Sequence, residues 1–173
     1  MYKYCPKCGS DLVYKRVGEN LRLVCKGCGF IFYQNPTPAV GVILMKDDEI
    51  LLVKRKYEPR AGFWSLPAGF LEWDENVEEA ARREVKEETG LEIELDGLFG
   101  VYSGFDDPRN HVLLVVYRGQ IRNGEIAAGD DATEVKFFPL TALPQDIAFK
   151  NHRRVLEKLK AKRKGNSFEN RAS

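Results

Sequence analysis

Residues 69–91 read GFLEWDENVEEAARREVKEETGL, and the rest of the chain is organised around this stretch. The pattern predicts a glycine loop, a helix over about residues 76–89, and a left-handed cap at Gly90. Three carboxylates crowd the last two turns of this helix: Glu84, Glu87 and Glu88. Their spacing of three and four residues places them on a shared face, where like charges repel and oppose the helix dipole.

The side of the helix on which these carboxylates lie decides between a solvated acidic helix and one that binds a metal ion. On a helical wheel of roughly 100° per residue, Glu84 and Glu88 point within about 20° of Val77, on the side expected to face the core. A solvated charged helix is the usual explanation, but inward carboxylates are unstable unless they are paired or bound to metal. A divalent cation such as Mg²⁺, held by oxygen ligands, is the simplest remedy.

The stretch resembles the Nudix box, which is a glycine, five residues, a glutamate, seven residues, and then Arg-Glu-aliphatic-x-Glu-Glu-x-Gly-aliphatic. Nine specified positions of the motif are filled, by Gly69, Glu75, Arg83, Glu84, Val85, Glu87, Glu88, Gly90 and Leu91. The resemblance implies hydrolysis of a nucleoside diphosphate linked to another moiety. It also implies an α/β fold, the Nudix α/β/α sandwich with a mixed sheet.

The same resemblance implies the roles of the carboxylates. Glu84, Glu87 and Glu88 are expected to hold Mg²⁺ or Mn²⁺, which activates a water for attack on phosphorus. One of Glu87, Glu88 or Glu134 is expected to remove the proton from that water, and the sequence does not choose among them. Glu134 has a second interpretation as a solvated loop acid.

The remaining candidate site residues are basic or structural. Arg83 is expected to orient the carboxylates and so to serve catalysis, and Glu75 to buttress the loop that starts at Gly69. Arg55 and Arg60 follow a predicted strand, where they are either a solvated strand end or charges that meet the substrate phosphate.

Four cysteines lie in the first 28 residues, as Cys5-Pro-Lys-Cys8 and Cys25-Lys-Gly-Cys28. The 16 residues between the pairs match a four-thiolate zinc site. Two disulfides and redox chemistry are the alternatives, and both fit the spacing less well. About 30 residues cannot build a core alone, so the predicted Zn²⁺ is structural.

The chain is therefore divided into a zinc ribbon at 1–34, a Nudix domain at 35–164 and a disordered tail at 165–173. Expected strands and the expected closing helix follow in order: strands at 12–15, 21–24, 39–45 and 50–53, a strand pair at 92–103, strands at 111–117 and 135–138, and a helix at 149–162.

The composition and net charge of the chain indicate which classes of binding partner are not expected. The 173 residues are 43% hydrophobic and 31% charged, which is typical of globular proteins. The net charge of +1 predicts no broad attraction to nucleic acid or membranes. No apolar run approaches the roughly 20 residues that span a bilayer, and no signal-peptide pattern opens the chain. A cytoplasmic location is expected.

The substrate follows from resemblance within the family. A zinc ribbon before a Nudix domain resembles the NADH pyrophosphatases, but their Ser-Gln-Pro-Trp-Pro-Phe-Pro signature is missing between residues 92 and 111. ADP-ribose pyrophosphatases carry a proline about sixteen residues past the box, and Pro108 lies seventeen past Leu91. ADP-ribose or a related dinucleotide is the expected substrate. Four aromatic residues are candidates either for stacking on adenine or for the core: Phe63, Trp64, Trp73 and Phe105.

Two hypotheses from other classes stand beside the hydrolase. One is a nucleic-acid-binding protein whose ribbon and basic tail grip RNA for cap processing, and the other is a ligand sensor with a Nudix fold. The intact box favours the hydrolase, for which a nucleic-acid partner is not expected. Homodimers are common among the enzymes that this chain resembles. His111 and His152 have no ligand-like neighbours in sequence and are expected to be structural or on the surface.

Overall fold

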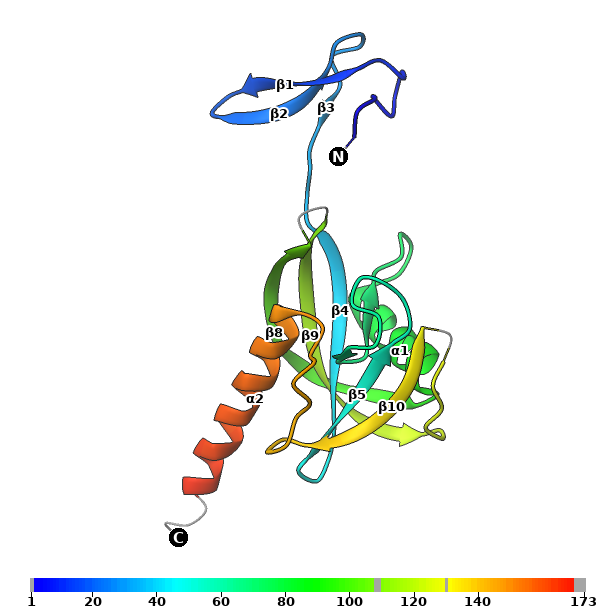
Figure 1. The fold of residues 1–173 in the computed structure, drawn as a ribbon, viewed down its shortest axis with the longest axis vertical. Coiled ribbons are helices and arrows are strands. Elements are labelled where there is room, and N and C mark those ends of the chain that lie inside the picture. Colours follow the sequence, from blue (N-terminus) through cyan, green and yellow to red (C-terminus); the bar gives the residue numbers. More distant parts are fainter. Residues whose placement is uncertain (1, 108–109, 130, 170–173) are drawn as a thin grey trace. The chain divides into compact units, whose positions relative to one another are not determined.

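The structure is a computed structural model that describes residues 2–107, 110–129 and 131–169. The chain separates into two units, with the division between Pro36 and Thr37 (Figure 1). This division lies two residues from the boundary predicted at 34/35. The units are described one at a time below.

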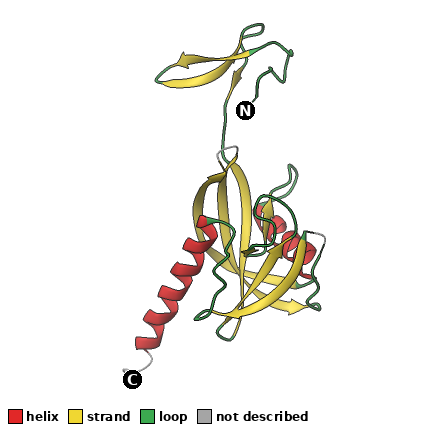
Figure 2. Ribbon diagram, in the orientation of Figure 1, coloured by secondary structure: helices red, strands yellow, loops and turns green. Residues whose placement is uncertain are grey.

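The first unit is a small antiparallel sheet in the order β1-β2-β3 (Figure 2). Its strands are β1 Leu12–Val17, β2 Asn20–Cys25 and β3 Ile31–Phe32. Its core holds Cys5, Leu12, Leu23 and Cys25, with Phe30 and Phe32 packed against them. Such a small core agrees with a fold that depends on a metal.

The second unit is built on a sheet in the order β10-β5-β4-β9-β8. The strands are β4 Thr37–Lys46, β5 Glu49–Arg55, β8 Glu92–Asp107, β9 Asn110–Asn123 and β10 Ala132–Pro139. Two short strands join it: β6 Trp64–Ser65 pairs with β5, and β7 Ala68–Phe70 pairs with β4. Strands β4 and β9 are parallel and the other pairs antiparallel, so the sheet is mixed.

Strand β4 is central because its side chains are buried on both faces. Val40, Val42 and Leu44 pack into the cluster that contains the apolar side of helix α1, Val77–Thr89. Ile43 packs into the other cluster, which contains the apolar side of helix α2, Lys150–Glu169. One helix thus covers each face of the sheet (Figures 1 and 2), and the predicted α/β/α sandwich is confirmed.

Two predictions about elements need correction. The pair of strands expected at 92–103 is one long strand, β8, that pairs with β9 through register shifts next to Gly97, Gly100 and Gly104. Bulges bend a strand without ending it, and the sequence pattern does not reveal them.

Helix α2 continues past Gly165 to Glu169, into the segment predicted to be a disordered tail. A glycine costs a helix only about 1 kcal/mol relative to alanine, and the preceding lysines and arginine are good helix formers. Residues 170–173 of that predicted tail lie outside the described part of the chain.

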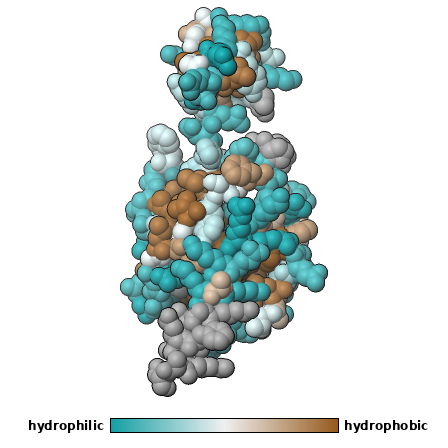
Figure 3. All heavy atoms as spheres, turned by 90° about the vertical axis from the view of Figure 1, so that its left-hand side faces the viewer, coloured by the Kyte–Doolittle hydropathy of each residue, from teal (hydrophilic) through white to brown (hydrophobic). Residues whose placement is uncertain are grey.

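Within the described ranges, no helix combines the length and the apolar character needed to cross a membrane. The space-filling view shows hydrophilic residues over much of the visible face, interrupted by apolar patches (Figure 3). Exposed apolar side chains on β8 include Leu98, Val101 and Phe105.

Candidate active site

Helix α1 begins where the sequence predicts because Asn76 caps it. The Asn76 Oδ1 accepts a hydrogen bond from the Glu79 N–H (2.9 Å), and the Glu79 Oε2 accepts one from the Asn76 N–H (3.0 Å). This reciprocal pair is a capping box, which satisfies two otherwise unpaired donors. The start of the box helix is thereby fixed relative to the loop before it.

The C-terminal end of α1 is held by the segment that precedes β10. Gly90 adopts the left-handed conformation (φ 73°) and donates its N–H to the Lys86 carbonyl at 2.9 Å. The Ala127 N–H donates to the Thr89 carbonyl, and the Gly129 N–H to the Glu88 carbonyl. A Cβ on Gly129 would lie 1.7 Å from the Glu87 carbonyl oxygen, so only glycine permits this contact. The segment before β10 is therefore packed directly against the helix turn that carries Glu87 and Glu88.

Arg83 links the loop to the carboxylates. Its guanidinium donates to both carboxylate oxygens of Glu75 (2.5 and 2.9 Å), to Glu84 Oε1 (2.8 Å), to Glu87 Oε2 (3.0 Å) and to the Phe70 carbonyl (3.1 Å). The hydrogen bonds from Arg83, helped by the Glu72 N–H, lower the pKa of Glu75 to about 2. Arg83 thus connects Glu75 of the loop with two carboxylates of the helix, and the orienting role of Arg83 and the buttressing role of Glu75 stay predictions.

Gly69 allows the loop to pass directly beneath Glu84. A Cβ built on Gly69 would lie 2.1 Å from the Glu84 Cδ, far inside van der Waals contact. The Glu84 side chain is only 13% exposed. Its burial raises its pKa, and Arg83 opposes that shift.

Glu88 is the most deeply buried carboxylate of the box, with 7% of its surface exposed. Its Oε2 accepts a hydrogen bond from the Ala68 N–H at 2.9 Å. Burial raises the pKa of Glu88 to about 8; the charges of Glu84 and Asp131 add to this shift, while Ala68 and Arg55 oppose it. Asp131 is an acidic neighbour that the sequence did not single out.

The inward direction predicted for Glu84 and Glu88 agrees with the structure, whereas Glu87 is exposed and turns to Arg83. In the described part of the chain, the four cysteines are the one cluster whose ligand atoms all lie close to one another. The donor set still fits a divalent cation, because it consists of oxygens alone, and Arg83 is shared among Glu75, Glu84 and Glu87 while the buried Glu88 has only the Ala68 N–H as a hydrogen-bond donor.

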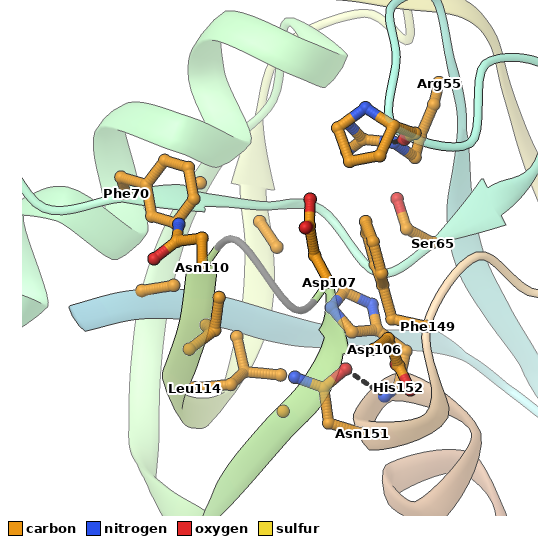
Figure 4. Close-up of a pocket in the computed structure, with 16 residues that line it drawn as sticks. Arg55, Ser65, Phe70, Asp106, Asp107, Asn110, Leu114, Phe149, Asn151 and His152 are labelled. Atoms are coloured by element: carbon orange, nitrogen blue, oxygen red, sulfur yellow. Dashed lines mark hydrogen bonds between the residues drawn. The ribbon is translucent and has the colours of Figure 1, made fainter. Parts of the chain in front are cut away.

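A cavity of about 230 Å³ opens beside this loop, bordered by Ala68 and Gly69 (Figure 4). Its apolar walls include Phe70, Val112, Leu114 and Phe149, and its polar walls include Arg55, Ser65, Asp106, Asn110, Asn151 and His152. A small apolar site with a few convergent polar groups is the usual form of a ligand pocket.

His152 and Asn151 form the buried polar wall of this cavity, and both residues are at most 5% exposed. The His152 Nδ1 accepts the Leu66 N–H at 3.2 Å, and burial lowers the pKa of His152 to about 3. The ring is therefore neutral, with its hydrogen on Nε2. The Asn151 Oδ1 accepts the His152 backbone N–H (2.9 Å), and its amide nitrogen points toward Leu114 (Figure 4).

Asn151 was not singled out in the sequence and His152 was expected only to be structural or on the surface, although a signal for the inward position of both was present. Asn151 and His152 each lie one turn before an apolar residue of α2, Val155 and Leu156, and so share the inward face of that helix. Polar groups on an apolar helix face need partners, or face a cavity.

Of the two arginines predicted to meet the substrate phosphate, Arg55 borders the cavity and Arg60 does not. Arg55 lies at the cavity, with its Nε donating to the Pro59 carbonyl (3.0 Å) and its guanidinium 5.1 Å from the Phe149 ring centre. Arg60 does not border the cavity and lies over the Phe63 ring instead.

Glu134 is exposed on β10 and lies 3.6 Å from the Lys54 ammonium. No contact in the described part of the chain joins Glu134 to the box glutamates. Its predicted role as a metal ligand or base stays a prediction, as does its interpretation as a loop acid.

The aromatic residues proposed for stacking lie elsewhere. Trp64 is buried against Phe138 in the core, Trp73 is fully exposed, and neither lines the cavity. Phe63 and Phe105 are also absent from its walls, where Phe70 and Phe149 take that place. Pro108, the predicted family marker, lies outside the described residues.

The four cysteines of the ribbon converge as the spacing predicts, with their sulfurs within 4.8 Å of one another. The Cys5–Cys28 and Cys8–Cys25 sulfur distances are 3.8 and 3.4 Å. Tetrahedral Zn–S bonds of about 2.3 Å place sulfurs roughly 3.8 Å apart, so the residues fit zinc. The Lys7 and Cys28 N–H groups point at the Cys5 and Cys25 sulfurs, both at 3.4 Å, which suits thiolate ligands.

Comparison with known proteins agrees with this geometry. The NUDIX domain family matches residues 35–159, and the family described as Nudix N-terminal, a zinc ribbon, matches residues 3–34. The ADP-ribose pyrophosphatase of Methanocaldococcus jannaschii is 48% identical over 126 residues, which is 72% of this chain and 73% of that protein.

Two further relatives extend the comparison. The NAD-capped RNA hydrolase NudC of Haemophilus influenzae is 38% identical over 101 residues, 57% of this chain but only 38% of that protein. The crystal structure of a NUDIX hydrolase from Nitrosomonas europaea superposes with a TM-score of 0.79 at 33% identity, and covers 90% of this chain and 88% of that one. Sequence, fold and site together show that this chain belongs to the Nudix hydrolase family, in the group that carries an N-terminal zinc ribbon.

Proposed function

We propose that this chain is an Mg²⁺- or Mn²⁺-dependent pyrophosphohydrolase that cleaves the diphosphate of ADP-ribose or of a closely related dinucleotide. The observation that carries the proposal is the pair of buried carboxylates, Glu84 and Glu88, set against a loop that also borders a ligand-sized cavity. The 48% identity to an ADP-ribose pyrophosphatase supports the choice of substrate.

Glu84, Glu87 and Glu88 would hold the cation, which lowers the pKa of a bound water and neutralises charge on the phosphates. Arg83 orients two of these carboxylates through its hydrogen bonds to Glu84 and Glu87. These hydrogen bonds restrict the rotation of both side chains before substrate arrives.

Glu88 is the residue best placed to accept the proton of the attacking water. The Ala68 N–H fixes the orientation of its carboxylate, and a cation bound beside it would favour the ionised form that can accept a proton. Glu87 is exposed and paired with Arg83, and Glu134 is paired with Lys54, so both are weaker candidates for the same step.

Arg55 would hold the diphosphate on the cavity side. Its Nε is committed to the Pro59 carbonyl, which leaves the two Nη groups for anionic oxygens. Burial lowers the pKa of Arg55, and an anion at this place would offset that desolvation.

The cavity would receive one nucleoside or sugar end of the substrate. Phe70 and Phe149 offer flat apolar surfaces, and Asn151 and His152 offer N–H donors at the buried wall. Such donors match carbonyl, hydroxyl or ring-nitrogen acceptors on the ligand.

Product analysis tests the proposal. The full-length protein with Mg²⁺, and separately with Mn²⁺, is incubated with ADP-ribose, NADH, NAD⁺, FAD, diadenosine polyphosphates, 8-oxo-dGTP and NAD-capped RNA, and products are separated by chromatography. AMP and ribose 5-phosphate in equal amounts from ADP-ribose, at the highest kcat/KM of the panel, are expected. If all compounds stay intact with both metals, the hydrolase proposal fails and binding of the same panel tests the sensor hypothesis.

A second candidate substrate is the NAD or NADH diphosphate, free or as an RNA cap. The 38% identity to NAD-capped RNA hydrolases favours it, and the same carboxylates would act on the same linkage. A kcat/KM for NADH or NAD-capped RNA above that for ADP-ribose would select this candidate.

A further inference from the structure

The net charge of +1 conceals an uneven distribution between the two units. Residues 1–36 carry six lysines and arginines against two acids, a net charge of +4, and the remaining chain carries 21 against 24, a net charge of −3. One Zn²⁺ with four thiolates contributes −2, which leaves the ribbon at +2. An anionic macromolecule is therefore attracted to the ribbon rather than to the second unit, Thr37–Ser173, which carries the Nudix box and is called the catalytic unit below.

Three residues on the ribbon's sheet form one row across its strands. Lys15 of β1 lies directly opposite Arg22 of β2, and the register set by the Leu23–Phe32 pair brings Tyr33 beside Arg22. Directly opposed residues project from the same face of a sheet. The Arg22 guanidinium lies 4.8 Å from the centre of the Tyr33 ring. Lys15, Arg22 and Tyr33 are called the basic row below.

The basic row projects away from the ribbon's core. Core residues Leu12, Leu23 and Phe32 occupy the alternate positions of the three strands, and so lie on the other face. Tyr33 is 54% exposed. Next to the row, Val13, Val24 and Ile31 form a second row on the same face, in which Val24 is buried and the other two are half-buried.

Folding alone does not account for the basic row. Like charges directly opposite each other in a sheet are destabilising. In the described part of the ribbon the ion pair is Lys26 with Asp11, and neither Lys15 nor Arg22 has a carboxylate partner. An external anion would satisfy both cations.

The exposed aromatic rings of the ribbon favour single-stranded nucleic acid among the possible anionic partners. Four of the seven tyrosines lie in the ribbon, and each is more than half exposed: Tyr2, Tyr4, Tyr14 and Tyr33. Unpaired bases stack on exposed rings while cations beside them contact the phosphates, which is how sheets bind single strands.

We propose that the basic row is a binding site for single-stranded nucleic acid, with one base stacked on Tyr33 and adjacent phosphates on Lys15 and Arg22. The site lies outside the catalytic unit, so it goes beyond the proposed hydrolysis. Two phosphate contacts predict a slope of about −1.4 for the logarithm of affinity against the logarithm of salt concentration.

Fluorescence anisotropy of a labelled, uncapped 12-nucleotide oligouridine tests this proposal. The probe is titrated with the zinc-loaded full-length protein in Mg²⁺-free buffer. Arg22→Glu and Lys15→Glu are each expected to weaken binding about ten-fold or more, and Tyr33→Ala by about ten-fold. Tyr33→Phe keeps the ring and should bind within about two-fold of wild type.

The matched control is Lys46→Glu, an exposed lysine of the catalytic unit, which should leave affinity unchanged. All variants should retain zinc and turn over ADP-ribose at the wild-type rate, so a failure of RNA binding is distinct from a failure of the hydrolase proposal. No binding by the wild-type protein would overturn the site. So would equal losses for Arg22→Glu and Lys46→Glu, or binding to phosphatidylserine vesicles with the same dependence on Arg22 and none on Tyr33.

Discussion

Gly69 is the residue on which the geometry of the box depends most directly. Its missing Cβ lets the Glu84 carboxylate lie against the loop backbone, at a place where a methyl group would be 2.1 Å from Cδ. Gly69→Ala must therefore displace Glu84 or the loop. Because a shift of about 1 Å at a catalytic group costs on the order of 100-fold in rate, kcat with ADP-ribose should fall by that factor.

Gly41→Ala is the control for Gly69→Ala. Gly41 lies on the neighbouring strand β4 and pairs with Ala68, but its added Cβ would meet no atom closer than 3.4 Å. Steady-state kinetics and thermal unfolding of both variants separate loss of geometry from loss of fold. Equal kcat in Gly69→Ala and wild type would contradict the contact.

His152 makes folding sensitive to acid. The folded protein keeps the ring neutral, with its pKa lowered to about 3 by burial, whereas the unfolded chain protonates it near its ordinary value. The unfolded state binds more protons between these values, so stability is present above about pH 6.5 and is lost as pH falls. One proton corresponds to about 1.4 kcal/mol per pH unit.

His152→Gln tests this dependence, since an amide oxygen can still accept the Leu66 N–H. Urea unfolding followed through buried Trp64 at pH 6 and pH 4 gives the free energies. The difference between wild type and variant is expected to shrink as pH falls, by about 1.4 kcal/mol per unit. A difference that is constant with pH would show that the ring is not held neutral.

At the scale of elements, helix α1 is set by its two ends. The Asn76–Glu79 capping box starts it and Gly90 ends it, and both signals are legible in the sequence. Asn76→Ala should cost about 1 kcal/mol and lower the melting temperature by about 3 °C, with little effect on KM. Asn123→Ala, at an exposed strand end, is the control, and calorimetry of both variants measures the effect. An unchanged melting temperature in Asn76→Ala would mean that the cap is not structural.

The parts of the site that the sequence predicts are those held by local spacing. Glu84, Glu88 and Arg83 lie on one helix, where the angle between side chains follows from residue number alone. The cavity is different, because Arg55, Phe149 and His152 come from elements that only tertiary packing brings together. The same reason explains why four other aromatic residues were proposed for stacking and none of them lines the cavity.

For the whole molecule, the two units have separate cores and separate chemistry. The positions of most long strands and the ribbon followed from motif and pattern, whereas the order of strands in the sheet, the long bent β8 and the length of α2 did not. Bulges and helix ends depend on small local free energies that composition does not determine.

The fold of the ribbon should depend on bound zinc, whereas the fold of the catalytic unit should not. Purified protein is expected to contain one zinc per chain, and Cys8→Ser with Cys28→Ser should abolish it and unfold the ribbon. The core around Trp64 and Phe138 should stay folded, because no ribbon residue belongs to it. Metal analysis and Trp64 fluorescence give the two readouts. Zinc retained in the double variant would refute the four-thiolate site.

The central claim is that the buried box carboxylates perform the hydrolysis, and the most direct measurement compares Glu88→Gln with Glu92→Gln. Glu88 is buried against Ala68, whereas Glu92 is an exposed partner of Lys86 just past the same helix. With Mg²⁺ and ADP-ribose, kcat is expected to fall at least about 100-fold in Glu88→Gln and to stay near wild type in Glu92→Gln. Near-normal AMP release by a folded Glu88→Gln protein would contradict the account.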